Sequence, residues 1–168
     1  VFHAHGPLEN MAVEDVPEPE AGPGQCLVAV RAVSLNGFDP MVLRGIPGLK
    51  TPLPMTPGAD IAGEILALGP GVDPGEWRVG QRVAVQPIQH DGMMGETKRG
   101  GLAERIAVDA RYLVPIPDAV GFEAAACLPT AYATAHRMLH TRGQVRAGER
   151  VLILGASGGV GTCAVQLA

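Results

Sequence analysis

Near the end of this 168-residue chain, an apolar run leads into a glycine-rich turn, and the turn leads into a helical pattern. The run at residues 151–154 is continuously apolar, which is typical of a strand buried on both faces of a parallel sheet. Gly155 ends the run. Because a strand, a tight glycine turn and a helix follow one another, the sequence predicts a βα unit at this end of the chain.

The glycine-rich turn has the spacing of the dinucleotide fingerprint G-x-G-x-x-G, with Ala156 in the place of the first glycine. A side chain at position 158 would block the approach of the backbone to a pyrophosphate, and one at position 161 would push the helix off the strand. Free N–H groups and the helix dipole then favour an anion. The alternative is a glycine-rich turn that holds no ligand. We predict that six residues of this turn bind the cofactor: Ala156, Ser157, Gly158, Gly159, Val160 and Gly161.

The choice between NAD and NADP stays open from these residues. The side chain that reads the ribose lies roughly 20 residues after the glycine turn in such folds, and the sequence ends before that position. Of the two cofactors we expect NADP(H) rather than NAD(H).

Charge and composition exclude several classes of protein. The net charge is −4 and no basic stripe exists, which argues against a nucleic-acid partner. No stretch reaches the ~18 apolar residues of a membrane span, so we expect no membrane partner. The three cysteines are widely spaced and suit neither a disulfide framework nor a zinc finger. A reducing cytoplasmic setting is therefore expected.

The first two thirds of the chain have the pattern of a turn-rich β domain. The 23 glycines and 15 prolines separate short apolar runs rather than forming a tract. Strands are predicted at 26–35, 61–68, 82–86, 102–108 and 112–116, with two further short strands within 1–16. Loops are predicted at 17–24, 47–57 and 87–100, and Gly63 indicates a bulge or a close approach. A short helix is predicted over 39–44, with Asp39 as its cap.

The pattern changes after Pro117. Residues 122–128 and 131–140 are alanine-rich with helical spacing, and Gly143 suits a helix C-terminus. The sequence therefore predicts a β domain over 1–117, followed over 118–168 by linking helices and the incomplete start of a dinucleotide-binding domain.

Four blocks in this order resemble the medium-chain dehydrogenase/reductase superfamily. Residues 57–65 resemble its P-G-x-D-x-A-G-x-V block, 79–83 its V-G-D-R-V block, and 100–104 its G-G-x-A-E block. Residues 148–166 are similar to the signature of the quinone oxidoreductase (zeta-crystallin-like) branch. The resemblance implies a fold between α+β and α/β, with a GroES-like β-barrel followed by the first βα unit of a Rossmann fold. It also implies hydride transfer from a nicotinamide.

The resemblance further implies a zinc-independent member. Zinc-dependent members begin their site with a Cys and a Ser or Thr two residues later, where this chain has Asn36 and Phe38. Their second ligand, a His, falls on Ala59, and their third, a Cys, falls near Ala126 or Cys127. Residues 86–99 contain none of the four cysteines of their structural zinc lobe. Since three protein ligands are needed at a catalytic zinc, we expect no metal.

Three residues are candidates for the catalytic site. By resemblance Asn36 lines the cleft and contacts a carbonyl or the nicotinamide ribose; the alternative is a turn-forming Asn. Asp39 is a candidate acid, but a helix cap is the preferred interpretation. By resemblance Thr130 contacts the nicotinamide side; it is also a possible helix N-cap. Asp60 is either a buried partner of a cleft hydroxyl or a surface strand residue, and we favour the second.

The expected activity is an NAD(P)H-dependent, zinc-independent reduction of a quinone, an enone or a similar activated carbonyl. The alternatives are an alcohol dehydrogenase-like enzyme and a non-enzymatic nucleotide-binding or structural protein of the same fold. The full-length form is expected to be a homo-oligomer. The 168 residues alone are expected to be inactive and to expose the apolar surface of 151–154 and of the helix that follows.

Overall fold

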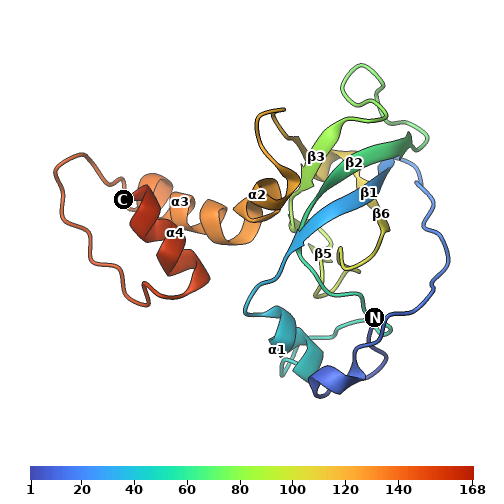
Figure 1. The fold of residues 1–168 in the computed structure, drawn as a ribbon, viewed down its shortest axis with the longest axis horizontal. Coiled ribbons are helices and arrows are strands. Elements are labelled where there is room, and N and C mark those ends of the chain that lie inside the picture. The colour runs from blue at the N-terminus through green and yellow to red at the C-terminus, as the bar shows by residue number, and fades with distance from the viewer.

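The computed structural model describes all 168 residues and places a β domain beside a helical arm (Figure 1). The domain is built on a five-stranded antiparallel sheet with the order β6-β1-β2-β3-β7. Its strands are β1 (Gln25–Ser34), β2 (Asp60–Leu68), β3 (Arg82–Val85), β6 (Arg105–Asp109) and β7 (Leu113–Pro115). The five main strands predicted from the sequence are therefore present. The predicted strand at 102–108 begins later than expected, at Arg105.

Alternating apolar residues explain why these strands form one sheet. Along β1, Cys26 and Val28 are buried, whereas Arg31 points to solvent. Ile61 and Ile65 of β2 are fully buried in the same core. The period of two puts these four side chains on one face, which packs into a cluster of 11 buried residues.

Gly63 in β2 confirms the predicted close approach of two strands. A Cβ atom at this position would overlap the carbonyl oxygen of Ala29 in β1 and would lie 2.9 Å from Cγ1 of Val28. The register of β1 against β2 shifts between Val30 and Ala32, next to this contact. The glycine therefore lets β1 pass close to β2 at the irregularity.

The segment 87–100, predicted to be a loop, contains a short hairpin. Strand β4 (Ile88–Gln89) pairs with β5 (Gly92–Met93). The following residue, Met94, is 3% exposed and belongs to the main core. Two-residue strands carry no measurable alternation, which is why the pattern did not reveal them.

The prediction of two strands within residues 1–16 is wrong. Phe2 forms only isolated bridges with Met11 and Met55, and a 3-10 helix, η1 (Leu8–Asn10), lies between. Phe2 instead packs with Val42 of α1 (Asp39–Arg44) in a separate small core. Tertiary packing of one aromatic side chain decides the conformation here, not local alternation.

The helical arm continues from the sheet in one direction and turns back on itself (Figure 1). A short 3-10 turn, η2 (Ala110–Tyr112), links β6 to β7 before the arm begins. The arm consists of α2 (Phe122–Ala126), the π-helical η3 (Leu128–Tyr132), α3 (Ala133–His136) and the π-helical η4 (Arg137–Arg142), which ends at Gly143 as predicted. The last helix, α4 (Gly159–Leu167), packs on α3 through buried Ala135 and Cys163. None of the helices has the length and apolarity required to cross a lipid bilayer.

The strand predicted at 151–154 does not form. These residues make no strand pairing, and the side chains of Leu152 and Leu154 are each 84% exposed. A parallel strand is stabilised only by neighbouring strands, and residues 151–154 belong to neither sheet of the structure. The helix half of the predicted βα unit is present as α4, and the expected exposure of its apolar surface is confirmed by Val165.

Candidate functional site

Three hydrogen-bond donors converge on the carboxylate of Asp60, the first residue of β2. The Thr130 hydroxyl donates to its Oδ1 at 2.7 Å, and the Thr130 backbone N–H donates to its Oδ2 at 3.2 Å. The side-chain amide of Asn36 donates to the same Oδ2 at 3.1 Å. One carboxylate therefore holds together the loop after β1, the start of β2 and the segment Leu128–Tyr132 (η3) of the helical arm.

The favoured prediction that Asp60 is a surface strand residue is wrong, because this residue is 1% exposed. The structure shows the other alternative, a buried partner of the Thr130 hydroxyl. Burial away from water is the main cause that raises the pKa of this carboxyl above its ordinary value of 3.8, and the nearby charge of Asp39 acts in the same direction. The hydrogen bonds from Thr130 and Asn36 lower the pKa and oppose part of that effect.

Asn36 joins two buried carboxylates. Its backbone N–H donates to Oδ2 of Asp39 at 2.6 Å, while its side chain donates to Asp60. The other oxygen of Asp39 accepts from the N–H of Gly58 at 3.2 Å. Asp39 thus fixes the backbone of two loops and caps no N–H of its own helix, whose N-cap position is Phe38. The interpretation of Asp39 as the cap of α1 is therefore wrong.

Thr130 lies inside η3 and does not cap a helix. No side-chain cap bond is made at the start of η3 or of α3, and the Thr130 side chain is committed to Asp60. The structure thus brings Asn36 and Thr130 to the same carboxylate, whereas Asp39 reaches them only through the backbone of Asn36. Sequence reasoning missed the central role of Asp60, for which the local signal was its place in the block at 57–65.

The glycine turn shows two different uses of glycine. A Cβ atom at Gly161 would overlap the carbonyl oxygen of Gly155 and would lie 2.8 Å from Cα of Ala156, so α4 packs on the turn only without a side chain there. A Cβ atom at Gly158 would meet one atom within 4 Å, the oxygen of Gly155 at 3.4 Å. The protein itself therefore leaves the space at 158 open.

The first turn of α4 carries unused donors. The backbone N–H groups of Gly159, Val160 and Gly161 donate to no acceptor in the protein, whereas that of Thr162 already bonds to Gly158. Together with the positive end of the helix dipole, these groups suit a bound anion such as a diphosphate. The donor set and the open position 158 fit the pyrophosphate of a dinucleotide.

The glycine turn and the Asp60 cluster lie on either side of η3. A Cβ atom at Gly159 would lie 3.9 Å from Cβ of Ala131, the residue next to Thr130. The hydroxyl of Tyr132 donates to the side-chain oxygen of Gln166 in α4. Because η3 touches both, the start of α4 and the Thr130 hydroxyl are held by the same short helical segment.

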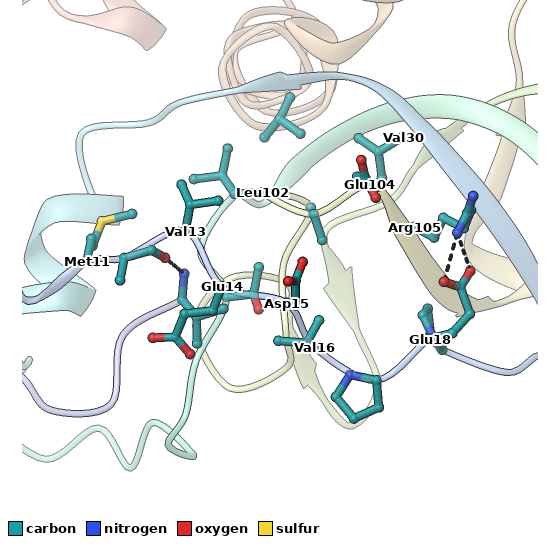
Figure 2. Close-up of a pocket in the computed structure, with 18 of the residues that line it drawn as sticks. Met11, Val13, Glu14, Asp15, Val16, Glu18, Val30, Leu102, Glu104 and Arg105 are labelled. Carbon is teal, nitrogen blue, oxygen red and sulfur yellow. Dashed lines mark hydrogen bonds and ion pairs between the residues drawn. The ribbon is translucent and has the colours of Figure 1, made fainter.

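A separate groove of about 830 Å³ lies in the β domain (Figure 2). Its walls are the extended N-terminal segment, part of β1 and the residues before β6, with Val13, Asp15 and Leu102 among its lining. Glu18 and Arg105 form an ion pair at its edge, with 2.6 Å between Oε1 and Nη1 (Figure 2). None of the six glycine-turn residues, and none of Asn36, Asp39 and Thr130, lines this groove.

The positions that resemble zinc ligands do not provide a zinc donor set. Cys127 is exposed at the end of α2, Ala59 has no donor atom, and Asn36 is bonded to Asp60. No group of three or more His, Cys, Asp or Glu side chains is arranged around a common point. These residues therefore do not fit a catalytic zinc, for which three protein ligands are expected.

Comparison with known proteins identifies relatives over most of the chain. A family model described as the alcohol dehydrogenase GroES-like domain matches residues 22–118. The chain is 39% identical over 149 residues to the synaptic vesicle membrane protein VAT-1 homolog of Mus musculus, covering 89% of this chain and 34% of that protein. It is 35% identical over 168 residues to the quinone oxidoreductase of Rattus norvegicus, covering 100% of this chain and 48% of that protein.

A solved structure of an NAD-dependent alcohol dehydrogenase has the same fold. It matches with a TM-score of 0.91 and 32% identity, covering 99% of this chain and 53% of that chain. The present chain thus spans about a third of the length of the VAT-1 homolog and about half the length of the other two proteins.

Proposed function

This chain belongs to the alcohol dehydrogenase GroES-like domain family, within the medium-chain dehydrogenases/reductases, and on that premise we propose that the protein is an NAD(P)H-dependent oxidoreductase. The proposed acceptor is a quinone, an enone or a similar activated carbonyl, reduced without zinc. The single observation that carries the proposal is the set of free N–H groups at Gly159, Val160 and Gly161, held by η3 beside the Asp60 cluster.

The glycine turn supports the cofactor half of the proposal. The diphosphate is held by the N–H groups of the first turn of α4, and the bare Gly158 allows it to approach the backbone. NADP(H) is proposed as the preferred form. The bound nicotinamide supplies the hydride.

Asn36 supports the acceptor half, and Thr130 supports the nicotinamide side of the cofactor half. Their side chains share the buried Asp60, which gives both groups a fixed position next to η3. In the reaction, Asn36 stabilises the negative charge that develops on the carbonyl oxygen of the acceptor. With no Lewis acid available from Asn36, Ala59 and Cys127, the acceptor must be activated by conjugation.

Reduction kinetics with the intact protein test this function. Oxidation of NADPH is followed with a panel of quinones and α,β-unsaturated ketones, and saturated aldehydes of similar size serve as the comparison. We expect turnover with the conjugated acceptors and metal analysis without stoichiometric zinc. Turnover confined to saturated aldehydes, or one zinc per chain, would contradict the proposal.

An alcohol dehydrogenase-like activity is the second candidate, because the solved NAD-dependent alcohol dehydrogenase shares the fold with a TM-score of 0.91. The discriminating measurement is the reduction of NAD⁺ by primary and secondary alcohols. This candidate predicts alcohol oxidation at a rate above that of quinone reduction, whereas the preferred proposal predicts the reverse order.

A further inference from the structure

We propose that Asp60 is a positioning residue that sets the hydrogen-bond polarity of the site: it makes the Thr130 hydroxyl an acceptor and the Asn36 amide a donor towards bound ligands. This inference rests on the proposed function and deepens it, because it assigns each group to a different part of the ternary complex. Thr130 takes an N–H donor of the cofactor, and Asn36 takes the oxygen of the acceptor.

The polarity of Thr130 follows from counting hydrogens. A hydroxyl has one hydrogen to donate, and an ionised carboxylate can only accept. The 2.7 Å bond from Oγ1 to Asp60 therefore uses the only hydrogen of Thr130 and leaves its lone pairs for a ligand. The second bond, from the Thr130 backbone N–H to the same carboxylate, fixes the backbone of Thr130 relative to Asp60.

The polarity of Asn36 follows from the same carboxylate. Its amide nitrogen faces Oδ2 of Asp60 at 3.1 Å, because the amide oxygen in that place would meet a second acceptor. One N–H of the Nδ2 group is thereby used, and the other remains. The bond from the Asn36 backbone N–H to Asp39 holds the residue at the end of β1 while its side chain points to Asp60.

Asp60 is buried without a cationic partner. None of the ion pairs in the structure includes it, and it is 1% exposed. Its charge is therefore stabilised only by the donors of Thr130 and Asn36. Leaving a buried carboxylate without these donors is unfavourable, so the two side chains keep the orientation that serves Asp60.

Each orientation selects a chemical group. The carboxamide of a nicotinamide carries an N–H donor that matches the lone pairs of Thr130. A quinone or enone offers a carbonyl oxygen, which matches the remaining N–H of Asn36. Thr130 could donate to the acceptor only if its one hydroxyl hydrogen left Asp60.

The test compares NADPH with its 3-acetylpyridine analogue, in which a methyl group replaces the carboxamide NH₂. The intact protein is expected to bind NADPH about fivefold more tightly than the analogue, which is the ratio that the loss of one hydrogen bond gives. Thr130→Val and Asp60→Asn are expected to reduce this preference to within about twofold. Thr130→Ser, which keeps the hydroxyl, is expected to retain it.

Asn36→Leu is the matched variant for the other half of the site. It is expected to keep the preference for NADPH over the analogue and to lower kcat/KM for the quinone. Thermal melting identifies any variant that does not fold. If Thr130→Val does not fold, the nucleotide preference of Thr130→Ser is compared with that of the parent protein.

The outcomes separate the two proposals. Suppose that the protein reduces quinones but that Thr130→Val and Asp60→Asn keep the preference for NADPH. The proposed hydrogen-bond polarity is then overturned, and the proposed function stands. If affinity for both nucleotides falls equally in the variants, Asp60 has only a structural role and the polarity is again overturned. If the intact protein binds neither nucleotide, both proposals are overturned.

Discussion

The hydroxyl of Thr130 donates a 2.7 Å hydrogen bond to Asp60, a residue 70 positions earlier in the chain that is 1% exposed. The bond joins the start of β2 to η3, the segment that also contacts the first turn of α4. A single buried carboxylate therefore connects the β domain to the part of the chain that we propose binds the cofactor.

Replacing Thr130 by valine should destabilise the protein. The change leaves Oδ1 of Asp60 without its donor, and a hydrogen bond to a charged group contributes about 1.5–3 kcal/mol. The free energy of unfolding from urea titration measures the effect. Thr134→Val is the control, because Thr134 lies on the exposed side of α3 and its hydroxyl is not seen in a hydrogen bond; it should change stability by less than about 0.5 kcal/mol. Equal effects of the two changes would refute the assignment.

Alanine at the two glycines of the turn, Gly158 and Gly161, should have different effects on the stability of the protein. Gly161→Ala places a Cβ atom against the backbone of Gly155 and Ala156, so it should lower the melting temperature. Gly158→Ala places its Cβ 3.4 Å from the oxygen of Gly155 at a φ of −77°, which alanine adopts freely, so stability should hardly change. Calorimetry of both variants checks this order. A larger loss of stability in Gly158→Ala than in Gly161→Ala would contradict it.

The stability contributed by Asp60 should fall as the pH rises. Its pKa is raised in the folded state, chiefly by burial, so the folded protein binds this proton more tightly than the unfolded chain does. The contribution is fully present below the ordinary pKa of 3.8 and is lost as the pH passes through the raised value. The unfolding free energies of the parent and of Asp60→Asn, measured by urea titration from about pH 3 upwards, test this. The advantage of the parent over the variant should shrink with pH, and an advantage that grows over this range would show the opposite shift.

Gly63→Ala should weaken the β domain strongly. The added Cβ overlaps the carbonyl oxygen of Ala29, and neither strand can move without breaking the sheet around it. We expect a loss of about 1–3 kcal/mol of unfolding free energy. Gly37→Ala is the control, since a Cβ there meets nothing within 4 Å. Similar stabilities of the two variants would show that β1 and β2 tolerate a wider spacing.

The sequence was sufficient to predict those helices and strands whose bounds are determined by their own residue pattern. Strand β1 alternates half-buried and buried residues over its first four positions, and α1 begins at Asp39 followed by a proline, so both were predicted within one residue. The hairpin of β4 and β5 was missed, because its strands have two residues each and its turn is formed by His90 and Asp91.

Contacts between distant segments could not be read from local patterns. The burial of Asp60 depends on Thr130, and nothing in the pattern of β2 distinguishes a buried carboxylate from a surface one. At 151–154 the expected exposure of the apolar run is confirmed, but the strand itself does not form, because a parallel strand needs neighbours. Residues such as Asn36 and Thr130 were identified by resemblance, and only the structure shows that they share one partner.

The most direct test of the account is a fluorescence titration of NADPH into the intact protein and its Gly158→Val variant. The Cβ atom of a valine would lie 3.4 Å from the oxygen of Gly155 at this position, whereas at Gly161 it would overlap that oxygen. We predict unchanged melting temperature and a loss of affinity of at least tenfold, about 1.4 kcal/mol. Equal NADPH affinity in the two proteins would contradict the claim that the N–H groups of Gly159, Val160 and Gly161 hold the diphosphate.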